Sequence, residues 1–140
     1  MTEPNGKHNQ AAVSAGAPGR VRTYRDLIAW RKAMDLVDLV YQATGSLPES
    51  ERFGLVPQMR RAAVSVAANI AEGHGRGRRA EFRRFLEIAR GSLCELQTEA
   101  EVCRRRAWLK GGLLSRFRDA CREADAVLAG LIRSMRRPSA

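Results

Sequence analysis

The stretch that decides the fold is EFRRFLEIARGSLCELQTEAEVCRRRA, residues 81–107. Apolar side chains recur in it at every third or fourth position, which places them along one face of an α-helix. This row consists of Phe82, Phe85, Ala89, Leu93, Leu96, Ala100, Cys103 and Ala107. The spacing predicts a long amphipathic helix that turns one face toward a core.

Stretches on both sides repeat this spacing. After the break at residues 110–112, the apolar row is Leu113, Phe117, Ala120, Ala124, Val127, Leu131 and Met135. From Thr23 onward, the apolar row is Leu27, Trp30, Met34, Val37 and Tyr41. Thr23 and Asp26 have the spacing of a capping box, and Gly45 is a typical C-terminal stop. These rows predict one helix before the central region and one helix after it.

One more helix is expected between residues 46 and 80. It should begin near Val56, because Pro57 is tolerated in a first turn but breaks a helix interior, and it should end at Gly73. Residues 46–54 before it have the pattern of a turn followed by a short helical piece. This helix is rich in Ala and Val, so it can approach its neighbours closely.

No strand pattern competes with these helices. The sequence therefore predicts an all-α fold, an antiparallel up-down-up-down four-helix bundle over residues 23–137, with a short helical piece between helices one and two. Residues 1–22 are rich in Gly, Pro, Ala and Ser without apolar periodicity, and we expect a disordered N-terminal arm there. The expected core consists of Leu27, Trp30, Met34, Val37, Val66, Ile70, Phe82, Phe85, Ala89, Leu93, Leu96, Phe117, Ala124 and Leu131.

The composition narrows the classes of partner. Of 140 residues, 25 are Lys or Arg and 15 are Asp or Glu, so the formal net charge is +10, which favours polyanions or an acidic protein partner.

The three cysteines contain no Cys-x-x-Cys pair, so neither a disulfide framework nor a zinc site is expected, and Cys103 and Cys121 are expected in the core. No signal peptide or membrane-spanning run is recognisable, which favours a cytoplasmic protein without a membrane partner.

Catalytic and metal-binding patterns are missing from the sequence. The histidines are His8 in the expected arm and His74 between two helices, and neither has a nucleophile or a metal-ligand motif beside it. We therefore expect no enzymatic activity, no catalytic residue, no metal and no cofactor.

Three carboxylates of the central helix also need an interpretation. Glu95 and Glu99 are four residues apart, with Glu101 close by, and Arg104 and Arg105 follow within reach. A solvated helix face that these arginines neutralise is the expected arrangement.

Residues 73–79, GHGRGRR, contain three glycines and three arginines between two predicted helices. Glycine loops that bind nucleotide cofactors follow a strand, and none is predicted here, so this segment is interpreted as a helix-breaking hinge. Gly73 is expected to end helix two in the left-handed conformation, and Gly77 to be the N-cap of helix three.

Arginines accumulate around this hinge. Arg78 and Arg79 would lie in the first turn of helix three, where the helix dipole disfavours positive charge. Arginines at a helix N-terminus can bind phosphate or can pair with Glu72 or another carboxylate, and both alternatives stay open. The candidate nucleic-acid-binding residues are Arg60, Arg61, Arg76, Arg78, Arg79 and Arg83. Few aromatic side chains accompany them, which favours salt-sensitive contact with the phosphate backbone over base stacking.

Three stretches give the chain a resemblance to a known family: YRDLIAWRKAMDLVDLVYQAT (24–44), GLVPQMRRAAVSVAANIAEGHGR (54–76) and EFRRFLEIARGSLCELQT (81–98). They resemble the bacterial four-helix bundle proteins named for the intervening sequences of 23S ribosomal RNA genes. The resemblance implies a bundle that assembles into a homopentameric ring. It also implies kinship with the accessory protein of diversity-generating retroelements, a basic pentamer that associates with a reverse transcriptase and nucleic acid.

Two functions follow as hypotheses. The first is a nonenzymatic, oligomeric protein that associates with nucleic acid, with RNA favoured, through its basic surfaces. The alternative is a protein-interaction scaffold, either a homopentameric ring or an accessory subunit of a reverse transcriptase or another protein, without physiological nucleic-acid binding. In the scaffold hypothesis, Asp26, Asp35 and Asp38 of helix one could face the basic hinge of a neighbouring subunit.

Overall fold

A computed structural model describes residues 21–136. These residues form four long helices, α2 (Ile28–Thr44), α3 (Leu55–Gly75), α4 (Arg79–Arg105) and α5 (Gly111–Arg136), and two short 3₁₀ turns, η2 (Tyr24–Asp26) and η3 (Glu49–Glu51). No strand occurs in this part of the chain. The predicted all-α class is confirmed, as are the four long helices and the short helical piece between the first two. The expected N-terminal arm lies outside the described residues except for Val21 and Arg22.

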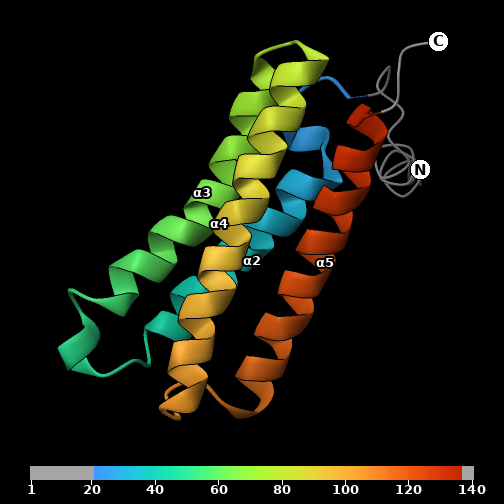
Figure 1. Cartoon of the computed structure of the whole chain (residues 1–140). Helices are drawn as coiled ribbons and strands as arrows, with labels where there is room; N and C mark the ends of the chain where they lie inside the picture. Colours follow the sequence, from blue (N-terminus) through green and yellow to red (C-terminus); the bar gives the residue numbers. More distant parts are fainter. Residues whose placement is uncertain (1–20, 137–140) are drawn as a thin grey trace, which may run out of the picture.

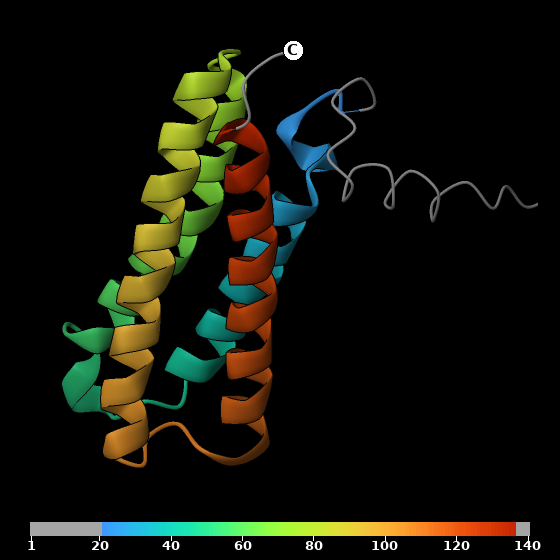
Figure 2. The same ribbon diagram turned by 45° about the vertical axis from the view of Figure 1, so that its right-hand side comes forward.

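The four helices enclose one core. Each helix packs against the next one along the chain, and α2 also packs against α5 (Figure 1). Both views place η2 and the last turn of α5 at the same end of the molecule as the connection between α3 and α4 (Figures 1 and 2). This end, formed by residues 21–29, 74–83 and 131–136, is referred to below as the upper end. Within residues 21–136, no helix is both long enough and apolar enough to cross a membrane.

Most of the predicted core is buried. Nine of the predicted residues are buried: Leu27, Val66, Ile70, Phe85, Ala89, Leu93, Leu96, Phe117 and Ala124. Trp30, Val37, Phe82 and Leu131 are half-buried and pack against the core. The prediction is wrong for Met34, which is 37% exposed. Cys103 and Cys121 are buried, as expected.

The error at Met34 reflects a different inward face of α2. Instead of the expected row, α2 buries Ala29, Ala33, Leu36, Val40, Ala43 and Thr44. Both rows have helical spacing, so periodicity cannot decide which one faces inward. The buried row contains several alanines, and small side chains let neighbouring helices approach closely.

The predicted capping box is present, but it caps η2. Thr23 accepts a hydrogen bond from the Arg25 amide, and the Asp26 carboxylate accepts bonds from the Arg22 amide at 2.9 Å and the Thr23 amide at 3.2 Å. Leu27 then takes an extended conformation, and α2 begins at Ile28 without a side-chain cap. The sequence therefore locates the start of helical structure correctly but not the start of the long helix.

The connection between α3 and α4 differs from the prediction. Gly73 does not end α3, which continues to Gly75. The glycine in the left-handed conformation is Gly77, with φ of +75°, and the N-cap of α4 is Arg78 instead of Gly77. Helix α4 also ends earlier than its predicted apolar row, because Ala107 lies beyond the helix with φ of +59°.

Helices α3 and α4 form the most extensive contact in the bundle. On α3 the buried side chains are mostly small, as at Ala62, Ala63 and Ala67. The hydroxyls of Ser65 and Ser92 form a hydrogen bond of 2.8 Å between the two helices. Small side chains and this polar contact fix the relative position of the two helices that carry the predicted basic hinge.

Candidate nucleic-acid interface

A cavity opens at the upper end, where four parts of the chain meet. Its volume is about 550 Å³, and its wall includes Leu27 before α2, His74 of α3, Arg78 and Phe82 around the start of α4, and Ser134 of α5. The walls come from segments far apart in the sequence, so sequence alone gives no indication of this cavity. It combines an apolar interior with basic side chains.

The six predicted arginines do not form one patch. Arg76, Arg78, Arg79 and Arg83 lie at the upper end, around the connection between α3 and α4. Arg60 lies sixteen positions before Arg76, which corresponds to roughly 24 Å along an α-helix. The structure therefore separates Arg60 and Arg61 from the other four.

Four of the six already have polar partners within the bundle. Arg76 pairs with Glu72 at 2.7 Å, and this hydrogen bond raises the pKa of the Arg76 guanidinium. Arg83 lies 3.3 Å from Glu87. In the structure, Arg76 and Arg83 therefore pair with carboxylates, which is one of the two alternatives that the sequence left open.

Arg60 is also held by its neighbours. Its guanidinium lies over the ring of Tyr41, 4.4 Å from the centroid, and its Nε donates a hydrogen bond of 2.9 Å to Thr44 Oγ1. These contacts join α3 to α2, which gives Arg60 a structural role.

Arg78 and Arg79 are the arginines directed to the cavity. Arg78 is exposed, and no carboxylate among residues 21–136 lies within ion-pair distance of it. Arg79 donates a hydrogen bond of 2.6 Å to the backbone carbonyl of Ser134 in the last turn of α5. A cation is favourable at a helix C-terminus, so this contact with α5 offsets the cost of placing Arg79 at the start of α4.

Four further arginines at the upper end were not predicted as site residues. They are Arg22, Arg25, Arg133 and Arg136, all of them exposed. The ion pair between Arg136 and Glu87, at 3.4 Å, links the end of α5 to the first turns of α4. These four side chains lie together only because the chain folds. In the sequence, the feature that they share is a position just outside a predicted helix or near its end.

The predicted solvated face of α4 is wrong at Glu99. Only 7% of Glu99 is exposed, and its Oε1 has no hydrogen-bond partner among the described residues. Burial raises the pKa of the Glu99 carboxyl, the neighbouring Glu95 carboxylate adds to the rise, and Arg61 opposes it. Glu99 lies where α4 contacts α3, so its position depends on tertiary packing that helical spacing alone does not reveal.

Arg104 and Arg105, which were expected to neutralise the three carboxylates of α4, both pair with Glu101. Arg104 donates two hydrogen bonds to its carboxylate, at 2.8 and 2.9 Å, and Arg105 donates a third at 3.2 Å. These bonds lower the pKa of Glu101 to about 2. The two arginines are therefore paired at the far end of the bundle from the cavity.

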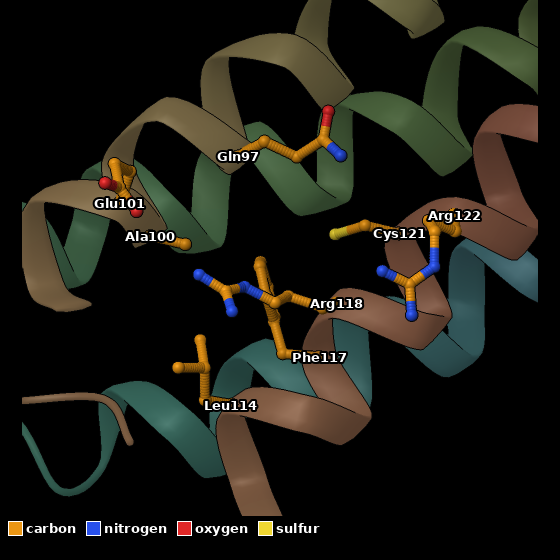
Figure 3. Close-up of a pocket in the computed structure, with 8 residues that line it drawn as sticks. All are labelled: Gln97, Ala100, Glu101, Leu114, Phe117, Arg118, Cys121 and Arg122. Atoms are coloured by element: carbon orange, nitrogen blue, oxygen red, sulfur yellow. The ribbon is translucent and has the colours of Figure 1, made fainter. Parts of the chain in front are cut away.

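A second cavity, of about 220 Å³, lies between α4 and α5. In Figure 3 the Cys121 sulfur points into the space between the helices, and the Arg118 guanidinium extends toward Ala100 and Glu101. Burial raises the pKa of the Cys121 thiol to about 12, so the thiol stays protonated at neutral pH. A protonated, buried thiol is a poor nucleophile, and this cavity carries no indication of covalent chemistry.

An apolar surface remains exposed along α2 and α3. Met34 is 37% exposed, Tyr41 is 47% exposed and Val64 is 44% exposed. Val64 lies one helical turn beyond Arg60, which stacks on Tyr41, so these side chains occupy the same side of the α2–α3 pair. They are referred to below, together with the half-buried Trp30 and Val37, as the α2–α3 apolar surface.

Comparison with known proteins agrees with the resemblance noted in the sequence. A family model described as 23S rRNA-intervening sequence protein matches residues 25–130, which is most of the chain and all but the ends of the bundle. A search of curated proteins found no match.

Proposed function

Because the chain belongs to the family of 23S rRNA-intervening sequence proteins, we propose that it is a nonenzymatic, oligomeric protein that associates with RNA through the upper end of the bundle. The observation that carries this proposal is the position of Arg78, exposed at a cavity rim without a carboxylate partner among the described residues. Arg79 lies beside it, and Arg22, Arg25 and Arg133 share the same end. A net charge of +10 adds a field that attracts polyanions to this surface.

Oligomerisation would strengthen such binding. In a ring of identical subunits, each upper end adds to the total charge, and several weak contacts to one RNA become a strong one. The homopentamer implied by the family resemblance is part of the proposal. The α2–α3 apolar surface is where we propose that the copies meet, since exposed apolar patches of this kind often mark protein interfaces.

The same apolar surface favours a second candidate function. In this alternative the protein is an interaction scaffold, either a ring or an accessory subunit of a reverse transcriptase or another protein, without physiological RNA binding. Asp35 and Asp38 are exposed on α2 and would offer carboxylates to a basic neighbour. The ion pair of Arg76 with Glu72 is consistent with this alternative, because it engages part of the basic hinge within the subunit.

Titration of a structured RNA by fluorescence anisotropy over a range of salt concentrations tests the RNA proposal. The informative variant is Arg78→Gln, and the matched control is Arg118→Gln, which removes the same charge from an exposed residue of α5 remote from the upper end. We expect Arg78→Gln to weaken binding by roughly 3- to 10-fold and to reduce the salt slope by about 1, with a smaller effect of the control.

Two outcomes would contradict the RNA proposal. Equal effects of the two variants would mean that charge acts without a defined surface. Absence of salt-dependent binding by the unmodified protein would rule out RNA association altogether.

Light scattering on the variant with Arg76, Arg78 and Arg79 replaced by Ala separates the two functions. Loss of the oligomer favours the scaffold, whereas an intact oligomer that no longer binds RNA favours RNA association.

A further inference from the structure

We propose that the cavity at the upper end binds one unstacked nucleobase, with the attached phosphate against Arg78. The preferred RNA is then a loop or a single strand, and a continuous duplex is a poor ligand because its bases are stacked and paired. This inference rests on the proposed RNA association and specifies what the same surface recognises.

The cavity has the size and the wall of a nucleotide site. Its volume of about 550 Å³ falls within the range of roughly 300–1,000 Å³ that is typical of small-molecule sites. Leu27, Leu131 and Met135 supply aliphatic surface. An apolar wall of this kind can cover a base from one side and exclude water from it.

Two aromatic rings form part of the wall. His74 and Phe82 lie edge to face, with ring centroids 5.7 Å apart and an interplanar angle of 83°. Both residues are half-buried and both line the cavity. Proteins that recognise unpaired RNA bases stack them on Phe, Tyr, Trp or His side chains. The sequence predicted Phe82 in the core; in the structure Phe82 is half-buried, packs against the core and also lines the cavity together with Arg78 and Arg79.

Polar groups at the cavity can read the edge of a base. The His74 ring lines the cavity and makes no hydrogen bond to any residue in the range 21–136, so within this part of the chain its nitrogens have no competing partner for a ligand. Ser134 Oγ donates to the Leu131 carbonyl at 2.7 Å and retains an oxygen that can accept. Gly77, with φ of +75°, places backbone without a side chain at the rim. A few polar groups in an apolar wall are what fixes the orientation of a bound ligand.

The rim supplies the charge that the phosphate needs. Arg78 is exposed at the rim, while Arg79 is held in place by its 2.6 Å bond to the Ser134 carbonyl. Guanidinium groups bind phosphate oxygens through two parallel hydrogen bonds. The base inside and the phosphate outside thus match the apolar interior and the cationic rim. A fatty acid would also match the charge, but it would leave the His74 nitrogens and the aromatic pair without a specific role.

Two RNAs of equal length test the inference: a hairpin with an unpaired loop and a fully paired duplex, each titrated by fluorescence anisotropy at one salt concentration. We expect the hairpin to bind about 10-fold more tightly, in keeping with the stacking of one base on aromatic side chains. Ser134→Leu places extra carbon in the cavity and should abolish this preference while leaving salt-dependent binding of the duplex. Ser115→Leu, the same change in an exposed residue at the other end of α5, should have no effect.

A second variant distinguishes loss of the binding site from loss of the fold. His74→Ala removes one ring without adding bulk, and it should reduce the hairpin preference several-fold while circular dichroism and the melting temperature stay close to those of the unmodified protein. Equal affinity of the unmodified protein for both RNAs, with the salt slope intact, would overturn the cavity inference and leave the proposed RNA association standing. No binding of either RNA would overturn both.

A free nucleotide carries the same base and phosphate as an RNA loop and could bind in the cavity in the same way. Adenosine 5′-monophosphate and uridine 5′-monophosphate are therefore titrated by calorimetry, followed by competition with the hairpin. Displacement of the mononucleotide by the hairpin identifies the RNA loop as the source of the base. Saturation by the mononucleotide without competition supports a nucleotide cavity for free nucleotides and overturns the RNA loop as its ligand. Binding of decanoate together with failure of both mononucleotides would overturn the inference.

Discussion

Gly73 of α3 lies so close to Phe85 of α4 that a Cβ atom added to Gly73 would be 2.6 Å from the Phe85 Cβ. The same atom would be 3.1 Å from Cδ1 of Phe82. Phe85 belongs to the buried row of α4, so neither helix can retreat without disturbing the core. Gly73 therefore sets how closely α3 and α4 approach at the upper end.

Replacing Gly73 by Ala should destabilise the protein. Alanine is the better helix former, but the added methyl group would clash with Phe85, and overpacking of this kind costs roughly 1–3 kcal/mol. The free energy of unfolding, measured by urea denaturation, is the relevant quantity. We expect it to fall in Gly73→Ala.

Gly91→Ala is the matched control for this substitution. Gly91 lies inside α4, and nothing comes within 4 Å of a Cβ atom placed there. The same chemical change should therefore stabilise the protein by roughly 0.5–1 kcal/mol. Equal effects of the two substitutions would show that the contact with Phe85 does not constrain the helices.

Glu99→Gln should stabilise the protein at neutral pH. The folded state buries the Glu99 carboxylate with one oxygen unsatisfied, and replacing it with an amide removes a buried charge. A gain of about 1 kcal/mol is expected, because the amide still leaves some buried hydrogen-bonding groups unpaired. Urea denaturation at pH 7 measures this gain.

The gain should depend on pH in a defined direction. Burial raises the pKa of Glu99, so the folded protein holds this proton more tightly than the unfolded chain. The difference in unfolding free energy between Glu99→Gln and the unmodified protein should be small below the ordinary pKa of a glutamic acid. It should grow as the pH rises from that value through the raised pKa. A difference that is constant across this pH range would mean that Glu99 ionises normally in the folded state.

The three cysteines should react at different rates with a thiol reagent. Cys94 is exposed, whereas Cys103 and Cys121 are buried and have raised pKa values. Ellman's reagent at pH 8 should modify one thiol rapidly in the folded protein and all three in urea. Cys94→Ser should remove the rapid phase, and a rapid phase that persists in this variant would contradict the burial of the other two.

Met34→Glu should weaken the proposed self-association without unfolding the subunit. Met34 lies on the α2–α3 apolar surface and is exposed in the subunit, so the change in unfolding free energy should stay within about 0.5 kcal/mol. A charge at this position would oppose burial between two copies, so the mass measured by light scattering should fall. Gln42→Glu introduces the same charge on another face of α2 and should leave the mass unchanged. An unchanged mass in Met34→Glu would exclude this surface as the contact between copies.

The sequence predicted helices well because their signals are local. Apolar spacing located α4 and α5, Pro57 located the first turn of α3, and Thr23 with Asp26 marked the first capped turn. What spacing could not decide was which face of α2 turns inward, because two apolar rows compete there. The end of α3 was missed for a related reason, since the requirement for glycine at position 73 comes from Phe85 on another helix.

The candidate site was predicted only in part. The sequence identified Arg76, Arg78, Arg79 and Arg83 as neighbours because they are close along the chain. It grouped Arg60 and Arg61 with them because all are basic, although the length of α3 separates the two groups. The cavity and the role of Phe82 in its wall depend on four segments meeting at one end, which no local pattern encodes.

The close fit of α3 and α4 also bears on how the chain folds. Only residues 76–78 connect the two helices, so little loop entropy is lost when they meet. Contacts near in sequence form faster than distant ones, so we expect this helical hairpin to be the earliest structured unit. Helices α2 and α5 also pack against each other, but they are far apart in the sequence, so this contact should form later. The order in which the helices acquire their final neighbours would then differ from the order in which they are synthesised.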